Sequence, residues 1–270
     1  MKKKIVVRGP CLTQSGYGEH ARMVLRALRA HEEHLDIYIL PTVWGHTGWV
    51  SDSNEFRDWM DQKIRDTQPY MAEKLPFDAS IQICIPNEWQ RMAPINVGVT
   101  AGIETTKISH QWLLKANEMD KVIVVSNHSK DLFDNTVYHG EDQHGNPATL
   151  KLTTPVEVVG FPARNIPSDD KFDLDLDYDF NYLFVGQWGP RKNIDNMIKW
   201  WLEENWEEEV GLVIKTSHRK NNLADRYLTK NRLSAISKTI QLDIEDKRCK
   251  IYLLHGDMTE SEMSALYNHT

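Results

Sequence analysis

The sequence has few cysteines, no long apolar run and no excess of positive charge. Its three cysteines are scattered at Cys11, Cys84 and Cys249, so they indicate neither a disulfide framework nor a metal site with regular ligand spacing. No apolar stretch approaches the ~18 residues of a membrane-spanning helix. The net charge of -7 is unfavourable for nonspecific binding of nucleic acid. We therefore expect a cytoplasmic chain with no nucleic-acid partner and no transmembrane segment.

The amino-terminal half alternates apolar runs, typical of buried strands, with segments of helical periodicity. The expected strands span residues 4–7, 35–40, 79–85, 95–101 and 121–125. Helix starts are indicated by Ser15, Ser109 and Ser126, because serine is a preferred N-cap residue. Residues 54–72 form a further, polar helix. This alternation predicts a doubly wound parallel sheet, which places the fold in the α/β class.

The pattern changes in the middle of the chain. Between residues 138 and 155, glycine, asparagine and proline separate short β-like runs, which predicts a small hairpin. Residues 156–160 form another expected strand. Residues 161–180 contain two prolines and six aspartates with little apolar periodicity, as a linker does. We expect an amino-terminal domain over residues 1–165, a linker over residues 166–180 and a carboxyl-terminal domain over residues 181–270.

A second alternating array begins at residue 181. Strands are expected at residues 183–185, 210–214 and 251–254. Between the first two, Asn193 is a good N-cap for a helix with one apolar stripe. That stripe consists of Ile194, Met197, Ile198, Trp201 and Leu202. A second helix is marked by Leu233, Ile236 and Ile240. Thr259 and Glu262 predict a capping box at the start of the last helix.

The turn between residues 185 and 194 contains the residues that indicate a binding site most clearly. It follows a parallel strand, and ligands bind at the carboxyl edge of such sheets. Gly186 and Gly189 allow close approach of the backbone to a ligand. Arg191 and Lys192 place two cations at the start of the helix after Asn193, where N–H groups and the helix dipole also favour an anion. The sequence therefore predicts a phosphate site, with a solvated basic turn as the alternative.

These residues resemble a known family. The pattern Gly-Gln-Trp-x-x-Arg-Lys-Asn at residues 186–193, followed by Val-Ile-Lys-Thr at 213–216, is similar to the nucleotide-binding domain of retaining glycosyltransferase family 4, which has the GT-B fold. The resemblance extends more weakly over most of the chain. It implies two Rossmann-like domains with the acceptor domain first. It also implies transfer of a hexose from a nucleotide-diphosphate sugar to a hydroxyl of a glycan, lipid or protein, with retention of configuration and without a metal or other cofactor.

The resemblance also implies roles for residues of the turn. Lys192 stands at the position of a family lysine that contacts the donor diphosphate. Arg191 and Lys215 are expected to assist it by stabilising charge on the leaving phosphate. Gln187 occupies a position where the family usually has an arginine, so the turn has one cation fewer.

Further candidates follow the first, second, fourth and fifth expected strands. Gly16 and Gly18 match a G-x-G-x-x-A dinucleotide pattern, but the preceding loop is too long and the second strand ends without an acid, so a dehydrogenase is disfavoured. The resemblance places this loop near the donor phosphate and the acceptor; a helix start that simply needs glycine is the alternative. The expected acceptor-side residues are Trp44, Glu104, Thr105 and His128. Glu104 is the one expected to orient the acceptor hydroxyl, and helix capping or packing is the alternative for each.

One departure from the family is expected to matter. Family members carry an acidic E-x7-E element after the position of Tyr267, and this sequence ends at Thr270. We expect either a fragment of a transferase, with an incomplete second domain, or a noncatalytic module that binds a sugar nucleotide or glycan. In both cases the strand at residues 183–185 is left with an unpaired apolar edge, so we expect the chain either to self-associate or to cover that edge with its own first domain.

Overall fold

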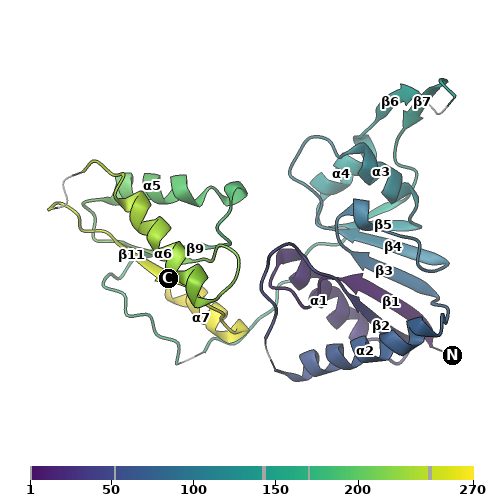
Figure 1. Ribbon diagram of the computed structural model, residues 1–270, viewed down its shortest axis with the longest axis horizontal. Helices are drawn as coiled ribbons and strands as arrows, with labels where there is room; N and C mark the ends of the chain where they lie inside the picture. Colours follow the sequence, from purple (N-terminus) through teal and green to yellow (C-terminus); the bar gives the residue numbers. More distant parts are fainter. Residues whose placement is uncertain (1, 52, 142–143, 170, 243–244) are drawn as a thin grey trace. The chain divides into compact units, whose positions relative to one another are not determined.

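In the computed structural model, residues 2–51, 53–141, 144–169, 171–242 and 245–270 are described. The chain divides into two compact units, each built on a parallel sheet (Figure 1). The first unit consists of Met1–Gly45 and Trp49–Ala163, and the second of His46–Gly48 and Arg164–Thr270. The prediction of two α/β arrays is confirmed.

The first unit contains a six-stranded sheet in the order β2-β1-β3-β4-β5-β8, and every pairing in it is parallel. Its strands are β1 (Lys3–Gly9), β2 (Leu35–Pro41), β3 (Ala79–Ile83), β4 (Ile95–Thr100), β5 (Lys121–Val124) and β8 (Val156–Val158). The order of the first five strands is that of flavodoxin-like sheets, in which the chain reverses direction across the sheet between β1 and β3. Ligands of such sheets bind at the carboxyl edge near that point.

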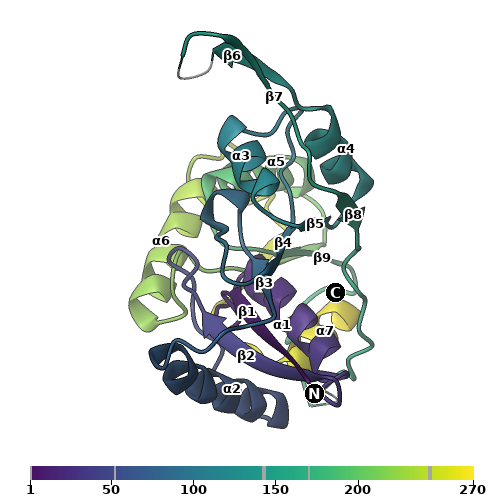
Figure 2. The ribbon, with the colours of Figure 1, turned by 90° about the vertical axis from the view of Figure 1, so that its right-hand side faces the viewer.

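Three of the four α-helices described in the first unit begin at the predicted caps Ser15, Ser109 and Ser126, and the remaining one begins after Asn54. The helices are α1 (Gly16–Arg29), α2 (Glu55–Ala72), α3 (His110–Asn117) and α4 (Asn127–Asn135), with a short 3-10 turn η1 (Pro86–Glu88). The side chains of Ser15, Asn54, Ser109 and Ser126 each accept a hydrogen bond from a first-turn N–H group. The predicted hairpin is confirmed as β6 (Tyr138–Glu141) paired antiparallel with β7 (Pro147–Leu150), and it projects from the unit (Figures 1 and 2).

Apolar side chains of the helices form two main core clusters with the sheet. Ala21 and Leu25 of α1 are fully buried in one cluster with Val7 of β1. Leu113 of α3 and Phe133 of α4 are fully buried in the other. The apolar side of α1 therefore faces the sheet.

The second unit contains a three-stranded parallel sheet in the order β11-β10-β9. Its strands are β9 (Asn181–Val185), β10 (Gly211–Lys215) and β11 (Lys250–Leu254). Its helices are α5 (Ile194–Asn205), α6 (Leu223–Ser237) and α7 (Glu260–His269), and the turn before α5 contains a short 3-10 segment, η2 (Pro190–Lys192). Ile194, Ile198 and Leu202 are completely buried against the sheet, so the predicted stripe of α5 is confirmed. The capping box of Thr259 and Glu262 also forms. Ile240 packs on the same core but lies beyond the end of α6.

The segment expected to be a linker is bound along the second unit. The Oγ of Ser264 donates to the carbonyl of Ile166 at 2.7 Å. The N–H of Asp177 donates to the hydroxyl of Tyr252 at 2.9 Å, and Lys250 pairs with the Asp177 carboxylate at 2.6 Å. Between β8 and β9, the described residues form no helix or strand.

Candidate functional site

The turn between β9 and α5 is fixed to the segment that follows β10. The N–H of Gly186 donates to the carbonyl of Lys215 at 3.0 Å, and the N–H of Trp188 donates to the carbonyl of Ser217 at 2.8 Å. Both bonds lie at the carboxyl ends of their strands, which is the ligand-facing edge of a parallel sheet. The turn that contains Lys192 is therefore at the edge where the sequence places a phosphate site.

Asn193 lies at the N-cap position of α5, but its side chain does not cap the helix. Its φ of 52° is in the left-handed region, which asparagine tolerates better than most residues. The cause is the preceding 3-10 turn, because the N–H of Asn193 closes that turn on the carbonyl of Pro190 at 3.1 Å. Its Oδ1 instead accepts from the Nδ2 of Asn196 at 2.8 Å. The side chain of Asn193 thus does not cap the first N–H groups of α5. Uncapped N–H groups at a helix start favour the binding of an anion.

The cations near this turn differ in their surroundings. Arg191 and Lys192 are exposed, and Lys192 forms no ion pair within the part of the chain that the structure describes. Lys215, at the end of β10, is half-buried and donates to the carbonyl of Gly256 after β11. Burial lowers the pKa of Lys215, while the carboxylates of Asp257 and Glu262 act in the opposite direction. The ammonium of Lys215 thus joins the turns after β10 and β11.

Gln187 and Trp188 hold the turn in place. The Nε2 of Gln187 donates to the carbonyl of His218 at 3.0 Å. The buried ring of Trp188 stacks on the ring of His218, with centroids 5.0 Å apart and planes inclined by 16°. Where the resembling family has a cation, this chain therefore has an amide that fixes the backbone.

Behind this turn lies a buried polar network that the sequence analysis missed. Asp225 on α6 accepts from the Nε2 of His255 at 2.9 Å and from the N–H groups of His218 and Arg219 at 3.0 and 3.1 Å. The side chains of Asp225 and His255 are only 8% and 2% exposed. Burial acts to raise the pKa of Asp225, but these hydrogen bonds outweigh it, so the pKa lies below its ordinary value. Asp225 therefore joins the loops after β10 and β11 as a carboxylate.

A sequence signal for this network exists. Asp225 and Thr229 fall on the same helical stripe as Leu233 and Ile236, so two polar residues occupy core positions of α6. The hydroxyl of Thr229 is 3.0 Å from the Nδ1 of His218 and donates to the carbonyl of Asp225. Buried polar groups need partners, so polar residues in an apolar stripe indicate such a network.

A second set of contacts supports Trp188 from α5 and α6. The guanidinium of Arg232 makes two hydrogen bonds to the Asp195 carboxylate, at 2.8 and 2.7 Å, and lies 5.5 Å from the Trp188 ring centroid. The Trp188 Nε1 donates to Asp195 at 3.4 Å. The Arg232 bonds lower the pKa of Asp195.

In the first unit, the candidate residues gather around Tyr17 at the start of α1. The Tyr17 hydroxyl lies 2.7 Å from the Thr100 hydroxyl at the end of β4 and accepts from the N–H of Ala101 at 3.3 Å. The ring of Trp44, in the loop after β2, packs against the Tyr17 ring with centroids 4.2 Å apart. Trp44 is therefore half-buried in packing, and a ligand would meet only part of its ring.

Gly16 and Gly18 differ in how much space surrounds them. A Cβ at Gly18 would lie 2.2 Å from the carbonyl oxygen of Thr13 and 3.0 Å from that of Pro10, whereas one at Gly16 meets no atom within 4 Å. Close packing is therefore sufficient to explain why residue 18 is a glycine. Of the two glycines, only Gly16 has room beside it for a ligand.

The loop after β4 packs on the start of α4. Gly102 has a φ of +81°, and a Cβ there would lie 2.2 Å from the Oγ of Ser129, so a side chain is excluded. Glu104 and Thr105 follow in this loop and are exposed, as is His128 in the first turn of α4. The hydroxyl of Thr105 donates to the carbonyl of Lys107 at 2.9 Å. The structure thus joins the segments that carry Glu104 and His128.

His20 is a buried titratable group near these loops. It is 7% exposed, and its Nδ1 has no hydrogen-bond partner among the described residues. Its ring meets the edge of Phe161 at a centroid distance of 4.8 Å. Burial lowers the pKa of His20 to about 4, so the ring is neutral at pH 7.

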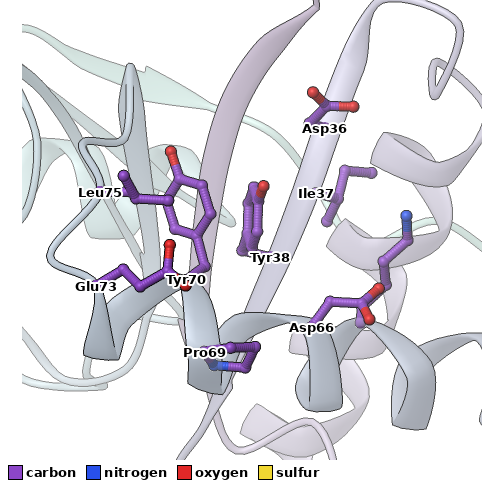
Figure 3. Close-up of a pocket in the computed structure, with 9 residues that line it drawn as sticks. Asp36, Ile37, Tyr38, Asp66, Pro69, Tyr70, Glu73 and Leu75 are labelled. Atoms are coloured by element: carbon purple, nitrogen blue, oxygen red, sulfur yellow. The ribbon is translucent and has the colours of Figure 1, made fainter.

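A separate pocket of about 470 Å³ lies between β2 and α2 (Figure 3). Its wall includes Tyr38 and Tyr70, whose ring centroids are 4.2 Å apart, with Asp36 and Asp66 at its rim. Asp36 is the second residue of β2, so the pocket lies toward the amino edge of the sheet. None of the site residues predicted from the sequence lines it.

The described residues contain no helix long and apolar enough to cross a membrane, and no group of three or more histidine, cysteine or carboxylate side chains placed to hold a metal. No protein-family model matches the chain, and no curated protein matches it.

Solved structures do match the chain. The apo structure of OtsA superposes with a TM-score of 0.56 at 10% identity, and a UDP-forming α,α-trehalose-phosphate synthase from Burkholderia xenovorans with 0.53 at 11%. Each match covers 100% of this chain and 77% of the other. The fold is GT-B-like. A mutant O-GlcNAc transferase from Thermobaculum terrenum, 12% identical with a TM-score of 0.48, is matched over 99% of this chain, which spans only 47% of that protein.

Proposed function

We propose that the chain takes part in transfer of a sugar from a nucleotide-diphosphate donor to an acceptor hydroxyl, by the retaining chemistry of glycosyltransferase family 4. The observation that carries the proposal is the turn after β9. Exposed Lys192 stands there beside the start of α5, whose first N–H groups Asn193 does not cap. Charge-assisted contacts and a helix N-terminus both favour the diphosphate.

The role of these groups is electrostatic. As the bond from the anomeric carbon to the donor phosphate oxygen breaks, negative charge develops on the nucleoside diphosphate that leaves. Lys192 and Arg191 stabilise that charge from the turn, while Gly186 and Gly189 let the backbone approach the phosphate. Asp225 fixes the adjoining loops in place, so the groups that contact the diphosphate need little rearrangement when it binds. The proposal needs no cofactor other than the nucleotide sugar.

In this proposal, the residues that bind the acceptor come from the first unit. Glu104 orients the acceptor hydroxyl from the loop after β4, with Thr105 and His128 on neighbouring exposed positions. Trp44 presents the uncovered part of its ring to the acceptor, and Gly16 leaves room for it. The acceptor is a glycan, a lipid or a protein.

A specific observation favours a second function, binding of a sugar nucleotide or glycan without catalysis. Gln187 donates to the carbonyl of His218, where the resembling family has a cation, and the ammonium of Lys215 is engaged by the carbonyl of Gly256. Both features reduce the positive charge that can face the leaving phosphate.

Turnover separates the two functions. A panel of UDP-, GDP- and ADP-sugars is incubated with the chain, and release of nucleoside diphosphate is measured with and without simple acceptors. Transfer predicts release that falls by about 10²-fold in Lys192→Gln, because one charge-stabilising contact is lost. Lys199→Gln, an exposed cation on α5 beyond the turn, is the matched control. Donor binding without release supports the noncatalytic function.

A further inference from the structure

Helix α6 exposes apolar side chains to solvent. Leu223 is 81% exposed, Tyr227 67% and Leu228 59%. Leu223 and Tyr227 are four residues apart and so lie on one side of the helix, while Asp225 and Thr229 on the other side are buried. Apolar groups concentrated on one exposed helix face indicate an interaction surface more strongly than scattered ones.

The same helix and its flanks are strongly basic. The cations between residues 219 and 238 are Arg219, Lys220, Arg226, Lys230, Arg232 and Lys238, and the one acid is Asp225, which is buried. Arg232 pairs with Asp195; the other cations are exposed and form no ion pair with any residue that the structure describes. This concentration of positive charge stands out in a chain of net charge -7.

Charged and apolar groups share one side of α6. Arg226 and Lys230 are three residues beyond Leu223 and Tyr227 respectively, which places each cation beside an apolar neighbour. Leu223, Arg226, Tyr227 and Lys230 are here called the α6 face. The face spans the first half of α6, and Figure 1 shows the helix beside α5 within the second unit. The acidic run at residues 203–209 begins in the last turn of α5, and none of its carboxylates forms an ion pair with a described residue of the α6 face.

We propose that the α6 face docks on the surface of an anionic lipid bilayer. Lysine and arginine can reach lipid phosphates while their aliphatic stems lie along apolar surface, and tyrosine and leucine side chains enter the interfacial layer. Charge complementarity favours this occupant, because unpaired cations flank the exposed apolar groups. A nucleic acid would satisfy the cations but would leave the leucine side chain without a partner.

Docking in this way has a consequence for the candidate site. α6 begins at the carboxyl edge of β10, and the phosphate turn lies at the same edge. A bilayer bound at the first half of α6 therefore approaches the edge where the turn lies. Under the proposed function, a substrate at the membrane surface becomes accessible; the docking itself does not depend on transfer activity.

Vesicle flotation tests the proposal with the full chain. One set of vesicles contains phosphatidylcholine alone, and a second contains phosphatidylcholine with phosphatidylglycerol. We expect binding to the second set only, weakened by salt, and a fall on the order of tenfold in both Leu223→Ser/Tyr227→Ser and Arg226→Gln/Lys230→Gln. The control Lys199→Gln/Trp200→Ser changes a cation and an exposed aromatic of α5 and should bind as wild type.

Three results would overturn the inference: no preference for anionic vesicles, equal binding of the α6 and α5 variants, or equally strong binding to an RNA of similar charge. Circular dichroism is used to check that these surface variants are folded. Because none of the changed residues belongs to the phosphate turn, nucleotide binding should be unchanged in the α6 variants. Failure at the membrane is thus distinguishable from failure of the proposed function.

Discussion

Substitution of the glycines at the start of α1 gives a sharp test of the structure. In Gly18→Ala the new Cβ would lie 2.2 Å from the carbonyl oxygen of Thr13 and 2.7 Å from its hydroxyl. Thr13 cannot move away easily, because it is 2% exposed and its carbonyl accepts from Arg22 at 2.9 Å. The change also threatens the cap in which the N–H of Gly18 donates to Ser15 at 2.9 Å.

The expected cost follows from these contacts. Overpacking costs about 1–3 kcal/mol and loss of a cap about 1 kcal/mol, so Gly18→Ala should lower the free energy of unfolding by about 2–4 kcal/mol. Gly16→Ala meets no atom within 4 Å, so its effect should stay within about 0.5 kcal/mol or be slightly stabilising.

Thermal and urea unfolding, followed by circular dichroism, measure the difference. We expect the melting temperature of Gly18→Ala to fall by about 5–10 °C and that of Gly16→Ala to match wild type. Equal melting temperatures for the two variants would refute the close approach of the loop to the helix. If Gly16→Ala weakens nucleotide binding without loss of stability, Gly16 has a role in ligand binding.

Three further predictions address the network, a buried histidine and a sheet edge. Asp225→Asn should lower the free energy of unfolding by about 2–4 kcal/mol, because one oxygen that accepts from His218, Arg219 or His255 becomes an amide nitrogen, which cannot accept. Exposed Asp175→Asn should have little effect, and equal melting curves for the two variants would contradict the network. Since the pKa of His20 is about 4 in the folded chain and about 6.5 in the unfolded chain, its contribution to stability is complete above pH 6.5. That contribution falls by up to about 3 kcal/mol as the pH drops to 4. His20→Phe should reduce the dependence of the free energy of unfolding on pH, measured by urea unfolding at several pH values. An unchanged dependence would exclude the lowered pKa of His20. β9 pairs only with β10 among the described strands and has exposed Val185, so light scattering should show concentration-dependent association that Val185→Lys abolishes; a monomer at every concentration would contradict it.

The elements were predictable where local interactions determine them. The buried residues of α5 recur at helical spacing, so the stripe from Ile194 to Leu202 identifies the face that meets the sheet. Ser15, Ser109 and Ser126 cap their helices through bonds to groups three residues away, which a sequence window contains. Parallel pairing then follows from the alternation of these elements.

The arrangement of the site was less predictable, because it depends on tertiary contacts. The 3-10 turn before Asn193 places that residue in the left-handed region and turns its side chain away from the cap. Asp225 and His255 are thirty positions apart, and no spacing rule joins them. Gly16 and Gly18 look alike in the sequence, yet only the second is confined by the loop that folds back over it.

Calorimetric titration of a nucleoside diphosphate tests the central claim most directly. Wild type, Lys192→Ala and the control Lys199→Ala are titrated with UDP, GDP and ADP at low salt, with inorganic phosphate as a reference. The proposal predicts that at least one nucleotide binds to wild type and to the control, and that Lys192→Ala binds it at least about tenfold more weakly, because a charge-assisted phosphate contact is lost. Equal affinity of wild type and Lys192→Ala for every nucleotide would contradict a diphosphate site at the turn after β9.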